Sequence, residues 1–298
     1  MFIGFVPLSF FFSIFLSLIL IYLDSRANLL GDSNLRDSAQ TLHKKSVSRF
    51  GGVAIYISTL LTIFVTYYLE FRWESTAILF VMLFCLPPFL IGLLDDLKFD
   101  MHPLLRIFLL LPAPVLFFYF GEIRVTSLDL GFIDDFLQIE IFALFFLCFS
   151  IVGMMNAFNL IDGINGLAMM IFIIFLVFLK LYISIDLNFF LLIFYIFFFF
   201  NIYRGRYFLG NSGSLFIGTV IGLYTIKAYN LSLFEKNSAE DIFILFLVPG
   251  LDMLRLFIQR IINKENPFKA DKSHLHHLLI RKYSLEKVLF IYFLVIVI

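Results

Sequence analysis

Long continuous apolar runs, separated by short polar stretches, follow one another along the whole chain. A helix of roughly 20 apolar residues crosses the hydrocarbon core of a bilayer, and continuous runs lack the alternation of a transmembrane barrel. The pattern predicts about ten membrane-spanning helices, at residues 2–23, 53–70, 76–94, 104–121, 139–158, 166–184, 188–203, 214–233, 241–262 and 286–298. The last run is the shortest, so either the final helix is short or the sequence is truncated there.

Composition supports a membrane protein. Hydrophobic residues make up 61% of the 298 positions, and the mean hydropathy is +0.99, whereas a soluble domain has roughly 45–50% apolar residues. In lipid, backbone polar groups must be paired within a helix or a closed barrel. We therefore expect a single all-α polytopic membrane domain over residues 1–298. The run 2–23 is expected to be a retained span, because no basic residue precedes it and no small-residue cleavage site follows.

The charges of the loops predict the orientation. When the loops are assigned alternately to the two sides, one side carries 17 of the 22 Lys and Arg with 11 acidic residues, and the other carries 5 with 11. The side rich in basic residues is the cytoplasmic one. It also holds all five histidines, so the active-site loops are expected to face the cytoplasm. On the other side, residues 123–131 are predicted to form a small extracytoplasmic hairpin. Pro87-Pro88 and Pro249-Gly250 are expected to interrupt spans three and nine with kinks or unwound turns.

Two adjacent carboxylates, Asp95 and Asp96, follow directly after the apolar run 76–94. Ionisable residues at membrane depth are costly and point to a function. Neighbouring carboxylates repel each other unless a positive group lies between them, and a divalent cation is the usual partner. The alternative is that both residues only cap the next helix, and the other polar stretches weigh against it.

A second polar stretch, residues 156–166, places Asn156, Asn159, Asp162 and Asn165 with two glycines at the end of a span. Buried amides in hydrocarbon cost free energy unless they are partnered. Asn156 and Asn159 are three residues apart and so share one face of a helix. Their oxygens suit a hard cation, and the glycines allow the backbone to turn close to a ligand.

Two further stretches are candidate phosphate sites. Residues 43–52 contain Lys44, Lys45 and Arg49, which favour a phosphate or anionic lipid headgroup, unless they form an ordinary positive-inside flank. Residues 210–214 read Gly-Asn-Ser-Gly-Ser and open a span. Backbone N–H groups at a helix N-terminus bind phosphate readily, and a plain N-cap is the alternative.

The stretch 252–277 combines Arg260 with three closely spaced histidines, His274, His276 and His277. Both cysteines lie inside apolar runs and no suitably placed acidic ligand accompanies the histidines, so a loop that binds an anion is favoured over a zinc site. Together the polar stretches supply acids and amides for Mg²⁺, cations for phosphates, and access to lipid. This combination fits phosphoryl transfer between a nucleotide and a membrane substrate.

Taken in order, Gly51-Gly52, Asp95-Asp96, Asn156-Ala-Phe-Asn-Leu-Ile-Asp-Gly, Gly210-x-Ser-Gly-Ser and His274-x-His-His resemble the motifs of the polyprenyl-phosphate N-acetylhexosamine-1-phosphate transferases. Each motif is weak alone, but the ordered set extends over nearly the whole chain. The resemblance implies a multi-pass enzyme of the bacterial inner membrane, surrounded by membrane lipid. Such an enzyme moves a sugar 1-phosphate from a UDP-sugar to undecaprenyl phosphate and releases UMP. Its cofactor is Mg²⁺, with Mn²⁺ as an alternative; no nucleic-acid partner is expected, and a homodimer is left open.

The resemblance also implies roles for residues. Asp95 and Asp96 would be the catalytic carboxylates. The ligands of Mg²⁺ would be Asp95, Asp96, Asn159 and Asn211. The nucleotide sugar would be bound by Asn156, Asp162, Asn165, Arg260, His274, His276 and His277. The lipid phosphate would be bound by Lys44, Lys45 and Arg49.

Two positions depart from the family pattern. Bacterial relatives commonly have Asp where this chain has Asn165, and the family uses an aspartate on Mg²⁺ where this chain has Asn211. An amide oxygen still ligates a metal, but one negative charge is missing. The expected role is the initiation of a surface polysaccharide or O-antigen. Two alternatives stay open: the phospho-N-acetylmuramoyl-pentapeptide transferase branch of peptidoglycan synthesis, and a membrane transporter or inactive homologue.

Overall fold

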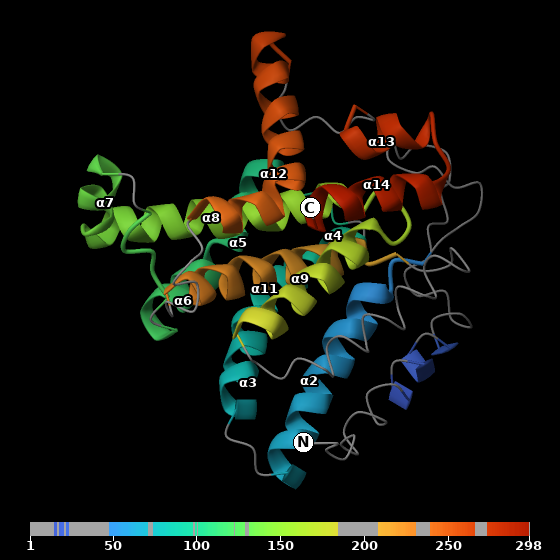
Figure 1. The fold of residues 1–298 in the computed structure, drawn as a ribbon. Coiled ribbons are helices and arrows are strands. Elements are labelled where there is room, and N and C mark those ends of the chain that lie inside the picture. Colours follow the sequence, from blue (N-terminus) through green and yellow to red (C-terminus); the bar gives the residue numbers. More distant parts are fainter. Residues whose placement is uncertain are drawn as a thin grey trace.

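The computed structural model describes residues 15–16, 18–20, 22–23, 48–70, 74–97, 99, 101–121, 123–128, 131–183, 208–230, 239–265 and 273–297. Within these residues the chain is helical and forms no strand, as the all-α prediction requires. The helices, labelled in Figure 1, are α2 (Gly51–Glu70), α3 (Glu74–Phe84), α4 (Leu86–Asp96), α5 (Pro103–Leu110), α6 (Pro112–Phe120), α7 (Phe132–Leu137), α8 (Glu140–Ile161), α9 (Leu167–Ile183), α11 (Gly210–Asn230), α12 (Ala239–Ile262), α13 (Leu275–Ile280) and α14 (Leu285–Val297).

Helix α11 is the central element of the fold. It packs against α8, α4, α2 and α9, and nearly all of its side chains from Ser212 to Tyr224 are buried (Figure 1). Small residues allow the neighbouring helices to approach it closely. A methyl group at Gly52 of α2 would meet the backbone of Gly213, and one at Gly92 of α4 would meet the backbone of Asn211. Because membrane helices gain little from burying apolar surface against each other, such close backbone packing is what holds them together.

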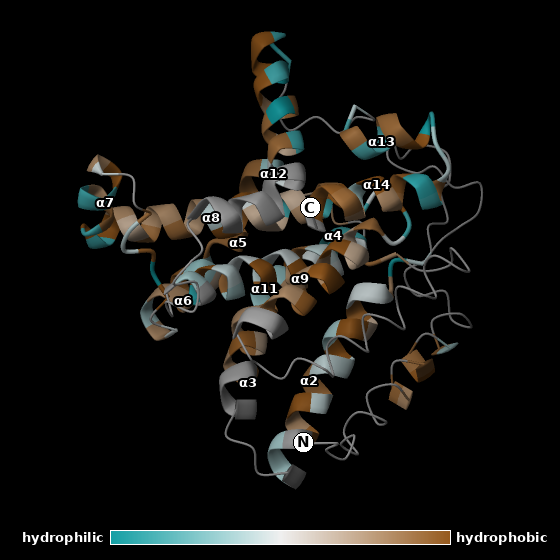
Figure 2. Cartoon of the chain, in the orientation of Figure 1, coloured by the Kyte–Doolittle hydropathy of each residue, from teal (hydrophilic) through white to brown (hydrophobic). Residues whose placement is uncertain are grey.

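Apolar residues run along the length of most helices, while hydrophilic residues gather near α7, α12 and α13 (Figure 2). Among the described residues, two helical stretches are long and apolar enough to cross a membrane: Pro103–Phe120, with a mean hydropathy of 1.9, and Glu140–Ile161, with 2.2. Gly51–Val65 and Leu167–Leu179 are shorter apolar helices. The total of ten spans and their orientation stay predictions, and the span predicted at 188–203 lies outside the described residues.

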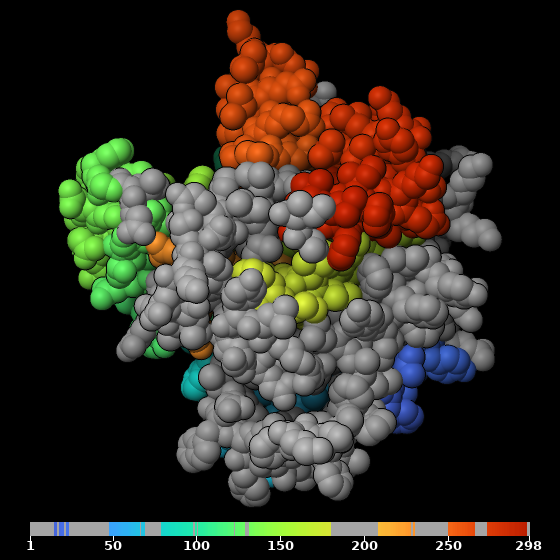
Figure 3. Space-filling view, viewed as in Figure 1, coloured from blue at the N-terminus to red at the C-terminus, as the bar shows by residue number. Residues whose placement is uncertain are grey.

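The two proline sites behave differently. The span predicted at 76–94 is divided into α3 and α4 by a turn at Cys85, and Pro87 and Pro88 lie in the first turn of α4. A helix tolerates proline there because its first N–H groups have no partner within the helix. The break in span three is therefore confirmed. Helix α12 stays helical through Pro249-Gly250, so no unwound turn forms there, but its first and later parts point in different directions (Figure 1). Its later part stands out from the body of the molecule beside α13 and α14 (Figure 3).

The hairpin predicted at residues 123–131 is wrong. Residues 123–128 lead into α7 and pair with no strand among the described residues. Asp134 in the first turn of α7 accepts hydrogen bonds from the Ser127 hydroxyl, at 2.9 Å, and from the Leu128 N–H, at 2.7 Å. The Gln138 amide donates to Thr126 O at 2.8 Å. Side chains of the helix thus pair with the groups that a second strand would have used.

Candidate functional site

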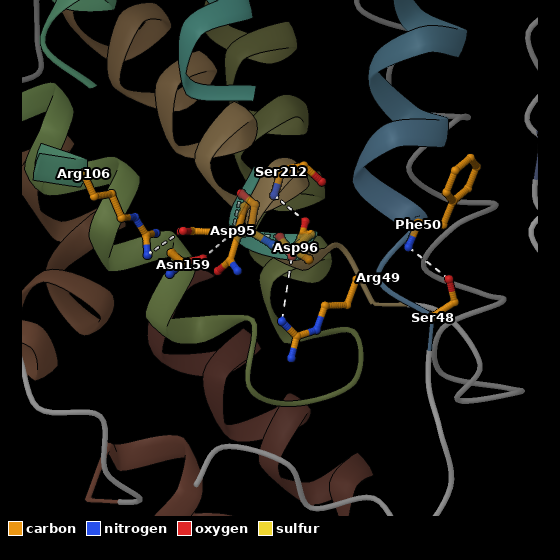
Figure 4. Close-up of polar contacts among 11 residues, drawn as sticks. Ser48, Arg49, Phe50, Asp95, Asp96, Arg106, Asn159 and Ser212 are labelled. Atoms are coloured by element: carbon orange, nitrogen blue, oxygen red, sulfur yellow. Dashed lines mark hydrogen bonds and ion pairs between the residues drawn. The ribbon is translucent and has the colours of Figure 1, made fainter. Parts of the chain in front are cut away.

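The N-terminus of α11 binds a carboxylate from α4. Asp96 is buried at the end of α4, and its Oδ1 and Oδ2 accept hydrogen bonds from the N–H groups of Asn211 and Ser212, each 2.9 Å long (Figure 4). A helix N-terminus has unpaired N–H donors and a partial positive charge, so it favours an anion. The sequence predicted a phosphate for these donors. In the structure they hold Asp96, which is 115 residues away from Asn211 along the chain.

A second carboxylate reaches the same helix end. The Gly210 N–H donates a hydrogen bond to Asp162, which follows the last residue of α8. Gly210 has φ +69°, and a methyl group there would lie 2.6 Å from Asp96 Oδ2 and 2.8 Å from Arg49 O. Only glycine combines this backbone conformation with such close neighbours. The turn at Gly210 therefore brings Asp96 and Asp162 to one place.

The charges at this helix end oppose one another. Burial is the largest cause that raises the pKa of Asp162 well above its usual value, and the nearby Asp96 carboxylate adds to it. Asp96 lies beyond the predicted span 76–94, and burial raises its pKa to about 6, against the effect of the Ser212 and Asn211 N–H groups. Arg49 lowers the pKa of both groups, and its Nη1 is 4.0 Å from Asp96 Oδ1 (Figure 4). The site thus holds more acid than the described cations balance, which suits a ligand that brings a cation.

Asp95 has a different partner from Asp96. Its Oδ2 forms an ion pair of 3.1 Å with Arg106 Nη1 on α5 (Figure 4). The Nε and Nη2 of Arg106 are buried and have no hydrogen-bond partner among the described residues. A buried guanidinium with unused donors is ready to bind an anion. Arg106 is a functional candidate that was not assigned from the sequence. It lies on α5, the helix that follows the Asp95-Asp96 pair along the chain.

The two amides of α8 have different partners: Asn159 contacts α11, and Asn156 bonds within α8. Asn159 Oδ1 accepts a hydrogen bond of 2.7 Å from the Ser214 hydroxyl, which also lies 2.9 Å from Gly210 O. A hydroxyl has one proton, so these two contacts alternate unless the Asn159 amide is turned to donate. Asn156 donates to Val152 O at 2.8 Å within its own helix. Asn159 therefore lies beside the carboxylate-binding end of α11, as its predicted metal role requires.

The turn after α8 meets the histidine loop. A methyl group at Gly163 would lie 3.0 Å from His276 Nε2 and 3.2 Å from His277 Nε2. Asn165 Oδ1, in the same turn, is buried without a hydrogen-bond partner among the described residues. His274 lies behind these rings, with its Nδ1 2.9 Å from Asp252 Oδ2 on α12. The structure thus joins the two stretches that the sequence assigned to the nucleotide sugar.

Not every predicted site residue can be placed. Lys44 and Lys45 lie outside the described residues. Arg260 is buried in the last turn of α12. Within the described part of the chain, no group of three or more His, Cys, Asp or Glu side chains is arranged to hold a metal ion. The donors around Asp95, Asp96, Asn159 and Asn211 are oxygens, the ligand type that Mg²⁺ prefers, and Mg²⁺ commonly uses only one or two carboxylates.

The chain is similar to known proteins over the region that contains this site. Residues 76–229 match the family model of Glycosyl transferase family 4. This range includes the Asp95-Asp96 pair, the turn after α8 and the N-terminus of α11. An undecaprenyl-phosphate alpha-N-acetylglucosaminyl 1-phosphate transferase from Thermotoga maritima is 30% identical over 258 residues, which cover 86% of this chain and 76% of the relative.

Two other relatives match over shorter segments. A decaprenyl-phosphate N-acetylglucosaminephosphotransferase from Mycolicibacterium smegmatis is 33% identical over 91 residues, 27% of this chain. A probable undecaprenyl-phosphate N-acetylglucosaminyl 1-phosphate transferase from Bacillus subtilis is 33% identical over 84 residues. These matches span 22% of each of the two relatives.

Proposed function

Because the chain belongs to glycosyl transferase family 4, we propose that it transfers a sugar 1-phosphate from a UDP-N-acetylhexosamine, or a modified derivative of one, to undecaprenyl phosphate and releases UMP. The names of the relatives support a polyprenyl phosphate as the acceptor. The observation that carries the proposal is the pair of adjacent carboxylates, each held by a different partner at one end of the bundle. This arrangement suits a reaction in which positioning and charge neutralisation do most of the catalysis.

The partners of the two carboxylates favour separate roles. Both oxygens of Asp96 accept backbone N–H groups, so its position is fixed by the fold. Asp95 uses only Oδ2 in its ion pair with Arg106 and keeps Oδ1 for a ligand. In the proposed reaction an oxygen of the lipid phosphate attacks the phosphorus that bears the sugar, and the bond from this phosphorus to the bridging oxygen of UMP breaks. Asp95 would orient the attacking phosphate or take its proton, and the unused Arg106 donors would stabilise charge on the phosphoryl oxygens.

Oxygen donors are available for Mg²⁺. Asp95, Asp96, Asn159 and Asn211 would hold the ion, which would offset the charge of the diphosphate when bound. The Asn211 N–H donates to Asp96, and the atom of Asn211 that would ligate Mg²⁺ is its side-chain amide oxygen. Asparagine instead of aspartate at position 211 therefore removes one negative charge from the site but keeps an oxygen ligand for Mg²⁺.

The remaining predicted residues surround this centre. Asn165 and His276 each present a buried polar atom without a partner among the described residues, which a bound nucleotide sugar would satisfy. Arg49 lies beside Asp96, on the side from which the predicted basic stretch 43–52 leads into α2. We assign the nucleotide sugar to the turn after α8 and the histidine loop, and the lipid phosphate to the region of Arg49.

The test is UMP release by the purified full-length protein with undecaprenyl phosphate, Mg²⁺ and a panel of UDP-sugars. We expect UMP with a UDP-N-acetylhexosamine and none when Asp95→Asn and Asp96→Asn are combined. Asp135→Asn is the matched control, because Asp135 is an exposed carboxylate on α7. Release with UDP-N-acetylmuramoyl-pentapeptide alone would assign the chain to the peptidoglycan branch. No release with any donor would contradict the proposed function.

We further propose that the enzyme lies in the bacterial inner membrane with these loops in the cytoplasm, as the predicted loop charges indicate. Lys282 and Thr126 are both exposed and lie on opposite predicted sides. In a background without Cys85 and Cys148, Thr126→Cys should react with an impermeant thiol reagent in intact cells, and Lys282→Cys should react only after lysis. The reverse labelling pattern would invert the topology.

A further inference from the structure

The carboxylate of Asp252 ties the histidine loop to α12. This side chain is buried, and its Oδ2 lies 2.9 Å from His274 Nδ1. Both of its oxygens lie 3.1 Å from the N–H of Leu275, the first residue of α13. Its Oδ1 accepts a further hydrogen bond of 2.9 Å from Arg255 Nη2. Asp252 thus fixes the start of α13 through one backbone donor and two side chains.

The contact with Asp252 determines where His274 carries its proton. An ionised carboxylate accepts hydrogen bonds and donates none, so the His274 proton must lie on Nδ1. In the neutral ring, Nε2 is then an acceptor. His274 is 5% exposed, and its ring stacks on that of His276 with the centroids 5.5 Å apart and the planes 11° apart. A rotation of the His274 ring would therefore displace His276.

His276 is the ring that faces the turn after α8. It is 1% exposed, and its Nε2 has no hydrogen-bond partner among the described residues. A methyl group on Gly163 would lie 3.0 Å from this nitrogen, so the ring packs directly on the turn. Burial, with His277 and His274 adding to its effect, lowers the pKa of His276 to about 3, and the ring is neutral at pH 7. A buried nitrogen without a partner costs free energy that a ligand can recover.

We propose that Asp252 is a positioning residue, which fixes the His274 ring by accepting its Nδ1–H and, because that ring stacks on His276, places His276 Nε2 against the ligand bound at the turn 162–166. His274 then acts through His276 and does not touch the ligand. Neither Asp252 nor His274 takes part in bond making or breaking. The inference rests on the proposed function only for the identity of the ligand, a nucleotide sugar. The link from Asp252 through His274 to His276 stands on the contacts themselves.

Asp252→Asn tests the tautomer with little change in shape. At the position of Oδ1 the amide must present its oxygen, because Arg255 donates there. Its NH₂ group then takes the position of Oδ2 and donates to His274 Nδ1, which moves the ring proton to Nε2. The matched control is Arg255→Gln, which removes another partner of the same carboxylate and its bond to Ser273 O but leaves Asp252 on His274.

The direct readout is nitrogen NMR of the full-length protein labelled with ¹⁵N-histidine, in detergent at pH 8. The chain has five histidines, and His274→Asn identifies the signals of His274 by their loss. We expect a protonated Nδ1 and a bare Nε2 in the wild type and in Arg255→Gln, and the reverse in Asp252→Asn. A proton on Nε2 of His274 in the wild type would overturn the inference. If Asp252→Asn does not fold, the wild-type and Arg255→Gln signals decide the question.

The functional readout is a double-mutant cycle on kcat/KM for UMP release. Asp252→Ala, which leaves the His274 Nδ1–H without its acceptor so that the ring can turn, should lower kcat/KM about 10- to 100-fold, the range known for residues that orient a metal-bound histidine. In a His274→Asn background it should lower kcat/KM less than about 2-fold, because the two residues act as one unit. Fully additive losses would show that Asp252 does not act through His274. If the wild type releases no UMP, the proposed function fails, while the nitrogen signals still test the inference.

Discussion

Two buried carboxylates, Asp96 and Asp252, both accept N–H groups at the start of a helix, but the helices differ. Asp96 binds the N-terminus of α11, a helix of 21 residues in the centre of the bundle. Asp252 binds the N-terminus of α13, a helix of 6 residues, and shares the task with the side chains of Arg255 and His274. The first carboxylate is held by backbone groups of the central helix, and the second by one backbone N–H together with two side chains.

This difference separates two kinds of site. Backbone donors on a buried helix have one position, so Asp96 is preorganised and its loss must affect both folding and chemistry. Side-chain donors can rearrange, so Asp252 sets an orientation that a substitution changes without dismantling the fold. The first arrangement suits the catalytic role proposed for Asp96, whereas the second suits a loop that is proposed to admit a nucleotide sugar.

The largest effect is expected at Asp96. Asp96→Asn would place an NH₂ group against a backbone N–H, which leaves a buried donor unsatisfied and costs about 1–3 kcal/mol of stability. The activity of the variant that folds should fall at least about 100-fold, roughly 3 kcal/mol of barrier. UMP release and thermal unfolding in detergent measure the two effects. Asp135→Asn should change neither, and a near-normal rate for Asp96→Asn would remove Asp96 from the catalytic site.

A smaller effect is expected at Gly210. Gly210→Ala adds a methyl group 2.6 Å from Asp96 Oδ2 and forces φ +69° on alanine, which costs roughly 1–2 kcal/mol. The displaced carboxylate should lower UMP release about tenfold. Gly153→Ala in α8 is the matched control, because nothing lies within 4 Å of a methyl group there and alanine favours a helix. Equal effects of the two substitutions would show that the close fit at Gly210 is unimportant.

The smallest effect is expected at Asn211. Asn211→Asp restores a negative charge beside Asp96, and its attraction to a cation is sizeable even at an effective dielectric near 20. The Mg²⁺ concentration for half-maximal UMP release should fall about threefold or more, with turnover retained. Phosphates in the ternary complex compensate for part of the missing charge, which is why the effect is modest. An unchanged Mg²⁺ requirement would show that Asn211 does not lie near the metal.

The sequence predicted the elements of the fold better than the partners of its polar side chains. The all-α fold and the break in span three agree with the structure, whereas the N–H groups of the turn 210–214, which the sequence assigned to a phosphate, bind Asp96. The hairpin at 123–131 failed because Asp134, a side chain from a short helix, takes the donors of that segment. Arg106 was visible as a basic residue, but only tertiary packing shows that two of its nitrogens are buried without a partner.

The histidine loop shows the same limit. Three histidines within four positions suggested one shared role in binding the nucleotide sugar. The sequence pattern could not show that His274 and His276 have different roles. The division depends on Asp252, which lies 22 residues before His274 and reaches it only because α12 and the loop fold back on each other. Contacts between residues this far apart in the sequence depend on how whole helices pack, so a local sequence pattern does not predict them.

The most direct test of the proposed sugar-phosphate transfer is mass spectrometry of the lipid fraction after the purified protein is incubated with UDP-N-acetylglucosamine, undecaprenyl phosphate and Mg²⁺. We expect an undecaprenyl diphosphate that carries the sugar, formed by the wild type and by Asp135→Asn but not by Asp95→Asn or Asp96→Asn. Testing other UDP-N-acetylhexosamines in the same way covers the modified sugars. Consumption of a UDP-sugar without any sugar-bearing lipid diphosphate, or equal product from the Asp96→Asn protein, would contradict this expectation.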